Sequence, residues 1–267
     1  MSTDGLAHFK AAQRQSWAHF APLEAQTTPP AAQLIKHAKV RAGQRVLDVA
    51  CGTGVAALTA ARVGATVTGL DLTPELLVRA RENAQLSNLE VEWHEGDVEQ
   101  LPFGDGAFDV VLSQYGHMFA PRPEVAVSEM LRVLKPGGTI AFSTWPPELL
   151  VGRRFAQVAR YLPPPPIPAA PPPLWGDPHV IRERLGAAVK DITFDRGRML
   201  VPALSVKHLC ATMERMAGPI LRAVELLSAT DPARLAEFRR EAEALVAEYF
   251  EDNVVHQDYL MTRATKI

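Results

Sequence analysis

The chain has 267 residues, with a hydrophobic fraction of 47%, a charged fraction of 22% and a formal net charge of −2 at pH 7. This length fits one large domain or a domain with a sizeable insertion, and the composition is that of an ordinary globular core. A nearly neutral chain has no overall basic field to attract nucleic acid, so neither DNA nor RNA is favoured as a partner.

The two cysteines, Cys51 and Cys210, are far apart and lack the spacing of a zinc site or a disulfide framework, so we expect no metal site. The polar N-terminus does not resemble a signal peptide. No apolar run approaches the roughly 20 residues that a membrane-spanning helix needs. These features predict a soluble, cytoplasmic protein.

The first half of the chain shows strand and helix patterns in alternation. The first forty residues look helical, with Phe9, Trp17 and Phe20 as apolar anchors and Pro29-Pro30 as a stop. Five strands are then predicted at 46–50, 66–71, 89–94, 108–113 and 139–144. Helices are predicted between them at 55–63, 74–84 and 123–134. This alternation is typical of an α/β fold with a doubly wound parallel sheet.

The second half departs from this rhythm. Residues 163–173 are mostly proline, which predicts an extended surface segment. A short helix at 178–185 and a sixth strand at 189–194 follow. Two or three helices are expected next, at 206–217, 219–228 and 232–250, before a terminal strand at 259–264.

A glycine-rich turn follows the first strand. Gly52-x-Gly54-x-x-Ala57 satisfies the dinucleotide-binding fingerprint, and glycines in such a turn let the backbone approach a ligand. Asp71, at the tip of the second strand, can accept hydrogen bonds from ribose hydroxyls. NAD and S-adenosylmethionine both need these features, so the turn alone does not distinguish between them.

Two more carboxylates favour S-adenosylmethionine. Asp48 lies inside the first strand, where its charge suits the cationic amino-acid end of that cofactor and would be poorly placed beside a pyrophosphate. Asp97 follows the third strand and can accept from an adenine amino group, with the Val98 N–H as the complementary donor. The predicted cofactor-binding residues are Asp48, Ala50, Gly52, Gly54, Asp71, Leu72, Asp97, Val98, Ser113 and Gln114.

Several segments together resemble class I S-adenosylmethionine-dependent methyltransferases, nearest to the ubiquinone/menaquinone-biosynthesis type with its methyltransferase type 11 domain. The similarity covers roughly residues 40–145. It implies a Rossmann-like seven-stranded sheet with an antiparallel last strand, and a cofactor held by the glycine turn, Asp71 and Asp97. The segments that carry it are Val46–Ala57, Gly69–Asp71, Gly96–Phe103, Phe108–Ser113 and Leu131–Gly138.

The predicted organisation has five parts. These are an N-terminal helical segment that covers the cofactor site at 1–40, the cofactor-binding core at 41–146, a proline-rich connection with the sixth strand at 147–204, an inserted helical lid at 205–256 and a terminal strand at 257–267. The segment after the fourth strand, Ser113 to Phe119, differs from the Gly-Leu-Arg-Asn-like segment of quinone-modifying members, which argues against a quinone acceptor.

His117 is the candidate catalytic base, because it follows the fourth strand and an imidazole has a pKa of about 6.5. The alternative is a structural loop histidine. Trp17 and Phe20 either close over the cofactor or bury the N-terminal helix against the sheet. Arg153-Arg154 is expected on a solvated helix face, with binding of an anionic substrate as the less favoured alternative.

These features predict an enzyme that transfers a methyl group from S-adenosylmethionine to a small-molecule acceptor by in-line displacement. The acceptor atom can be oxygen, nitrogen, sulfur or carbon, and a base is needed only if that atom arrives protonated. The alternatives are an RNA or protein methyltransferase, an NAD-dependent oxidoreductase and a non-catalytic protein that binds the cofactor. A homodimer is an assembly that the sequence permits.

Overall fold

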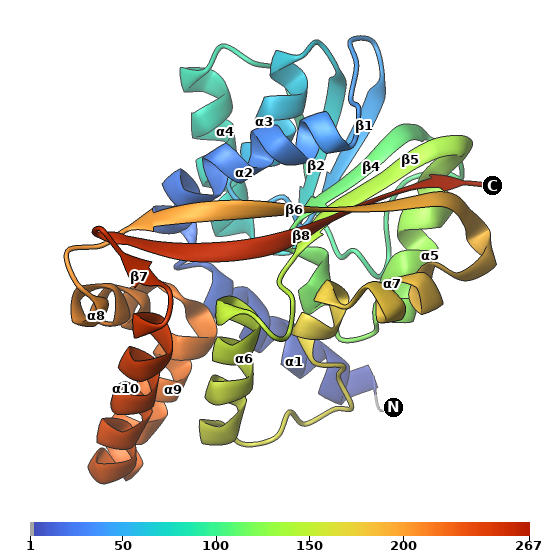
Figure 1. Cartoon of the computed structure of the whole chain (residues 1–267). Helices are drawn as coiled ribbons and strands as arrows, with labels where there is room; N and C mark the ends of the chain where they lie inside the picture. Colours follow the sequence, from blue (N-terminus) through green and yellow to red (C-terminus); the bar gives the residue numbers. More distant parts are fainter. Residues whose placement is uncertain (1–2) are drawn as a thin grey trace.

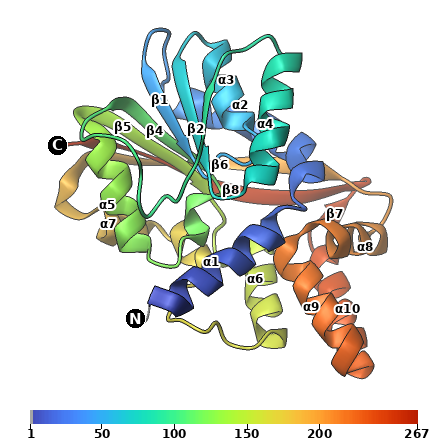
Figure 2. The same cartoon turned by 180° about the vertical axis from the view of Figure 1, so that it is seen from behind.

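A twisted sheet forms the centre of the molecule, and helices cover both of its faces (Figures 1 and 2). The structure is a computed structural model that describes residues 3–267. The strand order is β3-β2-β1-β4-β5-β8-β6, and a short β7 pairs with β8. The strands are β1 (Arg45–Val49), β2 (Thr66–Asp71), β3 (Glu92–Glu95), β4 (Phe108–Gln114), β5 (Leu134–Thr144), β6 (Val189–Pro202), β7 (Phe250–Glu251) and β8 (Val254–Lys266).

The pairing directions divide the sheet into a parallel part and an antiparallel part. β1 pairs in parallel with β2 and β4, β2 with β3, and β4 with β5. β8 is antiparallel to both β5 and β6. The prediction of a Rossmann-like, seven-stranded sheet with an antiparallel last strand is confirmed, with the two-residue β7 as an addition.

Alternate side chains of the central strands pack into two cores, because successive residues of a strand point to opposite faces. In β1, Val46 belongs to the core beneath α2 and α3, whereas Leu47 belongs to the core beneath α5 and α7. Val110 and Val111 of β4 divide in the same way. These four helices are α2 (Glu24–His37), α3 (Val55–Arg62), α5 (Pro123–Val133) and α7 (Pro178–Leu185), and a further helix, α4 (Pro74–Leu86), follows β2.

The prediction that Pro29-Pro30 stops a helix is wrong. The first helix, α1, ends much earlier, at Trp17, and both prolines lie inside α2. This helix buries Pro30, Leu34 and Ile35, and burial of that apolar face offsets the cost of proline in a helix interior. Tertiary packing therefore overrides the local signal.

The last two long strands extend well beyond their predicted limits. β6 continues to Pro202 and β8 begins at Val254, because the two strands pair along almost their whole length, from Val189 with Lys266 to Pro202 with Val254. The third strand is shorter than predicted and begins at Glu92. Local sequence patterns do not show where a partner strand will extend a ladder.

Four helices pack together into what we call the helical cap, seen at the lower edge of Figure 1. The three helices predicted between residues 206 and 250 are confirmed, whereas α6 lies in a region expected to be only a connection and a strand. Buried Val158, Phe238 and Ile220 join these helices in one apolar cluster. The members of the helical cap are α6 (Leu150–Tyr161), α8 (Val206–Met216), α9 (Gly218–Thr230) and α10 (Pro232–Ala247).

α1 (Thr3–Trp17) crosses beside the helical cap, as Figure 2 shows. A short helical turn, Ala21–Leu23, leads from it into α2. The proline-rich segment from residue 163 has no regular structure until the turn at Pro172–Gly176. Within residues 3–267, no helix has both the length and the apolar character needed to cross a bilayer.

Candidate functional site

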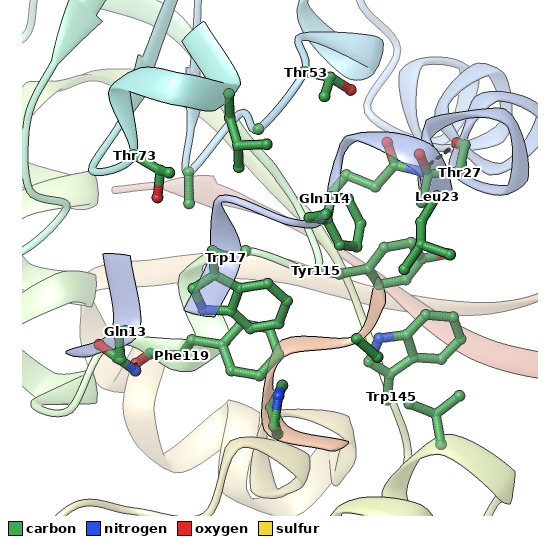
Figure 3. A pocket seen from close by; sticks show the side chains of 18 of the residues that line it. Gln13, Trp17, Leu23, Thr27, Thr53, Thr73, Gln114, Tyr115, Phe119 and Trp145 are labelled. Atoms are coloured by element: carbon green, nitrogen blue, oxygen red, sulfur yellow. Dashed lines mark hydrogen bonds between the residues drawn. The ribbon is translucent and has the colours of Figure 1, made fainter. Parts of the chain in front are cut away.

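A cavity of about 300 Å³ lies at the carboxyl ends of β1, β2 and β4, between the sheet, α1 and the helical cap (Figure 3). The residues that line it come from distant parts of the chain, from Lys10 in α1 to Gln257 in β8. In open α/β sheets, ligands bind at this edge, where the carboxyl ends of parallel strands meet. The cavity therefore lies where the strand order predicts a site.

The glycine turn after β1 forms one wall of the cavity. Ala50 and Gly52 line it, and both have left-handed backbone angles, with φ of 50° and 56°. Gly54 does not line the cavity, and its contact with the cofactor stays a prediction. It has φ of 80° and lies against the Trp93 ring, where a side chain would collide with that ring. Its role is to allow close packing of the turn.

Asp71 is fixed at the end of β2 by two backbone N–H groups. Gly52 donates to one carboxylate oxygen over 2.7 Å, and Thr73 donates to the other over 2.8 Å. Burial raises the pKa of Asp71, and these N–H groups oppose the shift. Both Asp71 and its neighbour Leu72 line the cavity. Thr73 occupies the N-cap position of α4, but its side chain makes no capping hydrogen bond.

Asp48 lines the cavity with a carboxylate that is unpaired within residues 3–267. Its side chain is 1% exposed, and neither oxygen has a hydrogen-bond partner there. Burial raises the pKa of Asp48 to about 8, and the nearby Asp71 carboxylate adds to the shift. A buried, unpaired carboxylate is costly and is stabilised by a cation. This position suits the ammonium group of a ligand.

Asp97 and Val98, which are predicted to contact the adenine, line the cavity beside β3. One oxygen of Asp97 accepts from the backbone N–H of Glu99 over 2.9 Å. The ammonium group of Lys10 forms ion pairs with both Asp97 and Glu99. Through Lys10, α1 is attached to the third acidic residue of the site.

The two predicted residues at the end of β4 behave differently. Gln114 lines the cavity, and its side-chain amide donates to the carbonyl of Thr27 over 2.7 Å (Figure 3). Ser113 is fully buried and does not line the cavity, and its contact with the cofactor stays a prediction. Its hydroxyl donates to the carbonyl of Val49 over 2.9 Å, and this bond joins β4 to β1. The same hydroxyl accepts from the N–H of His117.

The prediction that His117 is a catalytic base is also wrong. Its side chain is 0% exposed, does not line the cavity, and lies with its ring centroid 4.6 Å from those of Phe142 and Trp175. Burial lowers the pKa of His117 to about 3. The chain after β4 turns in a short helix, His117–Phe119, which directs His117 into the core and Phe119 to the cavity.

Tyr115, which is not among the predicted site residues, is part of the cavity wall. Its backbone is left-handed, with φ of 63°, and its ring stacks on Trp145 at 4.2 Å between centroids (Figure 3). Its buried hydroxyl has no hydrogen-bond partner among the residues described. Tyr115 and Trp145 therefore form a rigid aromatic wall.

Apolar side chains enclose the end of the cavity away from the acids. Trp17 and Phe20 both line it, and the ring centroids of Trp17 and Phe119 are 4.5 Å apart (Figure 3). The contribution of α6 is not predicted from the sequence, although the apolar residues of α6 follow a helical spacing. The lining residues from the cap include Leu150, Val151, Arg154, Phe155, Val158, Leu209, Met213 and Ile220.

The cavity thus has two chemically different ends. Buried carboxylates and the exposed backbone of a glycine turn can hold a ligand that carries a cation and a nucleoside. The apolar end can hold a second, water-excluded molecule next to it. This arrangement suits a group transfer between two bound molecules.

Comparisons with known proteins agree with this arrangement. Residues 47–142 match a family model described as a methyltransferase domain. The chain is 36% identical over 257 residues to an uncharacterized protein of Mycobacterium tuberculosis, covering 95% of this chain and 93% of the relative. It is 42% identical over 109 residues to a demethylmenaquinone methyltransferase of Thermus thermophilus, covering 40% of this chain and 50% of that protein.

A solved structure shares the fold. A putative methyltransferase from Bacillus halodurans superposes with a TM-score of 0.59 at 22% sequence identity, covering 88% of this chain and 98% of the other. At 88% of this chain, the superposition extends well beyond the matched residues 47–142.

Proposed function

The chain belongs to the class I S-adenosylmethionine-dependent methyltransferases, and from this membership we propose that its methyl acceptor is a small apolar molecule bound beneath the helical cap. S-adenosylmethionine is the cofactor of this family. When bound, it supplies a methyl group on a positively charged sulfur.

The described residues fit this cofactor. The unpaired carboxylate of Asp48 suits its ammonium group, and the oriented carboxylate of Asp71 suits its ribose hydroxyls. Asp97 and Val98 line the part of the cavity where the resemblance to the family implies an adenine site. The backbone of Ala50 and Gly52 supplies the close approach that such a ligand needs.

The observation that carries the proposal is the enclosed, apolar acceptor end. Side chains of α1, α6, α8 and α9 surround it, including Trp17, Phe155 and Ile220. A cavity lined by side chains from four helices fits a small molecule better than a folded macromolecule. The net charge of −2 also gives a nucleic acid little attraction.

The chain's own part in catalysis is to position the acceptor and exclude water. Rigid rings such as Tyr115 and Trp145 limit where the acceptor can lie, and correct alignment is worth up to several kcal/mol of the barrier. Because His117 is buried in the core, it does not take a proton from the acceptor.

Release of S-adenosylhomocysteine in the presence of phenols, thiols, amines, carboxylic acids, RNA and protein tests the proposal. We expect turnover with a small molecule of one of these classes. Methyl transfer to RNA or protein with no small-molecule turnover would overturn it.

The cofactor site has its own prediction. Asp71→Asn should weaken S-adenosylhomocysteine binding by roughly 1.5–3 kcal/mol, measured by calorimetry, because a charge-assisted acceptor is lost. Asp109→Asn is the matched control, since Asp109 pairs with Lys135 away from the cavity. Equal affinity in wild type and Asp71→Asn would mean that the ribose site is elsewhere.

A further inference from the structure

Two adjacent arginines of α6 have opposite surroundings. Arg153 forms two hydrogen bonds to Glu248, at 2.5 and 2.8 Å, and a third to the Tyr249 hydroxyl. Arg154 instead lines the cavity, at its apolar end. The expectation that both arginines lie on a solvated helix face is therefore wrong for Arg154.

The guanidinium of Arg154 is held in place by neutral groups. One of its N–H groups donates to the Gln157 side-chain oxygen over 2.8 Å, and Gln157 in turn donates to the carbonyl of Phe238 over 3.0 Å. The Arg154 guanidinium also lies 5.2 Å from the centroid of the Phe238 ring. These contacts fix its position and leave most of its five N–H donors unused.

No carboxylate in the described part of the chain lies within ion-pair distance of Arg154. Glu214, an acidic residue near enough to influence it, is bound by two hydrogen bonds from Arg239, at 3.0 and 2.7 Å. Cys210, also near, has its thiol pKa raised by burial, so it stays neutral. Burial lowers the pKa of Arg154, yet an arginine keeps its charge at neutral pH.

The charges of the cavity are therefore separated. Asp48, Asp71 and Asp97 line the cofactor end, whereas the one uncompensated cation among the described lining residues lies among apolar side chains such as Phe155, Val158 and Met213. An anionic group on an acceptor would be stabilised by Arg154. One guanidinium balances one negative charge, and its planar donors match a carboxylate.

We propose that Arg154 binds a carboxylate of the methyl acceptor, so that the substrate is an apolar monocarboxylate oriented with its acidic group towards α6. This inference rests on the proposed function, because it assumes that the apolar end of the cavity holds the acceptor. Arg154 is then a positioning residue for the substrate and takes no part in the transfer itself.

The test is calorimetric binding of 2-naphthoate and 2-naphthamide, two ligands of the same shape, to the protein saturated with S-adenosylhomocysteine. We expect wild type to bind naphthoate about tenfold or more tightly than naphthamide, as expected for charge-assisted hydrogen bonds. In Arg154→Gln this preference should disappear while naphthamide affinity is unchanged. Arg154→Lys should restore part of it.

Arg153→Gln is the matched control, because it removes the adjacent positive charge outside the cavity, and it should keep the full preference. Lack of a naphthoate preference in wild type, or its persistence in Arg154→Gln, would overturn the inference. If Arg154→Gln does not fold, the wild-type comparison alone decides. Failure of S-adenosylhomocysteine to bind wild type would instead contradict the cofactor assignment.

Discussion

At the scale of single residues, Asp48 links cofactor binding to the stability of the ligand-free chain. Burial raises its pKa from 3.8 to about 8. Between these two values, the folded chain holds a proton that the unfolded chain releases. The contribution of Asp48 to the free energy of unfolding is therefore highest below pH 3.8. It falls as the pH rises towards about 8.

Asp48→Asn should raise the free energy of unfolding of the ligand-free protein by a few kcal/mol at pH 8, since each pKa unit corresponds to about 1.4 kcal/mol. At pH 4 the two proteins should differ little, because Asp48 is then protonated in the folded chain. Urea unfolding at both pH values measures this. The same variant should bind S-adenosylhomocysteine more weakly. A gain in stability that does not depend on pH would contradict this account.

The acids of the site were predictable from sequence, whereas the loop after β4 was not. Asp71 and Asp97 each follow a recognisable strand, and the carboxyl ends of parallel strands meet at one edge. Which way His117 points depends on the left-handed backbone of Tyr115 and the helical turn after it. Neither feature has a local signature in the sequence, so the sequence does not show that His117 belongs to the core.

At the scale of elements, α1 and α9 form a close junction over the cavity. A side chain at Gly218, the first residue of α9, would approach the carbonyl oxygen of Ser16 to 2.6 Å. Since Ser16 precedes the cavity-lining Trp17, this contact positions the end of α1.

Gly218→Ala should therefore separate the two helices and destabilise the protein by about 1–3 kcal/mol, as overpacking does. Amide hydrogen exchange in α1 should become faster, and urea unfolding should report the loss of stability. Gly104→Ala is the control, because a side chain there would meet no neighbour within 4 Å. If both variants behave alike, α1 is not held by this junction.

Some strands of the sheet can be predicted from the local sequence, whereas others cannot. The runs around Val110 to Leu112 were recognisable because both faces of a parallel sheet are buried. The part of β6 beyond its predicted end at residue 194 contains Asp195, Arg196 and Arg198, which do not suggest a strand. These residues are extended because β8 pairs with them. Such long-range pairing is invisible in a short window of sequence.

At the scale of the whole molecule, β8 joins the parallel strands to β6. It pairs with β5 on one side, from Thr139 to Thr144, and with β6 on the other. It also contributes Gln257 to the cavity. A homodimer and a cytoplasmic location remain predictions, to be checked by sedimentation and by localisation of the full chain.

Deletion of residues 254–267 should abolish cooperative unfolding and S-adenosylhomocysteine binding, because β5 and β6 lose their common partner. Far-UV circular dichroism during urea titration measures the first effect, and calorimetry measures the second. Deletion of Ile267 alone, which is 64% exposed, is the control and should change both little. A truncated chain that still unfolds cooperatively would show that the parallel part of the sheet is self-sufficient.

The position of the last strand between β5 and β6 also has a consequence for synthesis on the ribosome. By the time β5 has emerged, the glycine turn and all three site acids have already been made, yet the edge that β8 will cover is still open. More than a hundred residues must follow before that strand arrives. A growing chain of this enzyme therefore exposes a long, apolar strand edge for most of its second half, when it depends most on protection from aggregation.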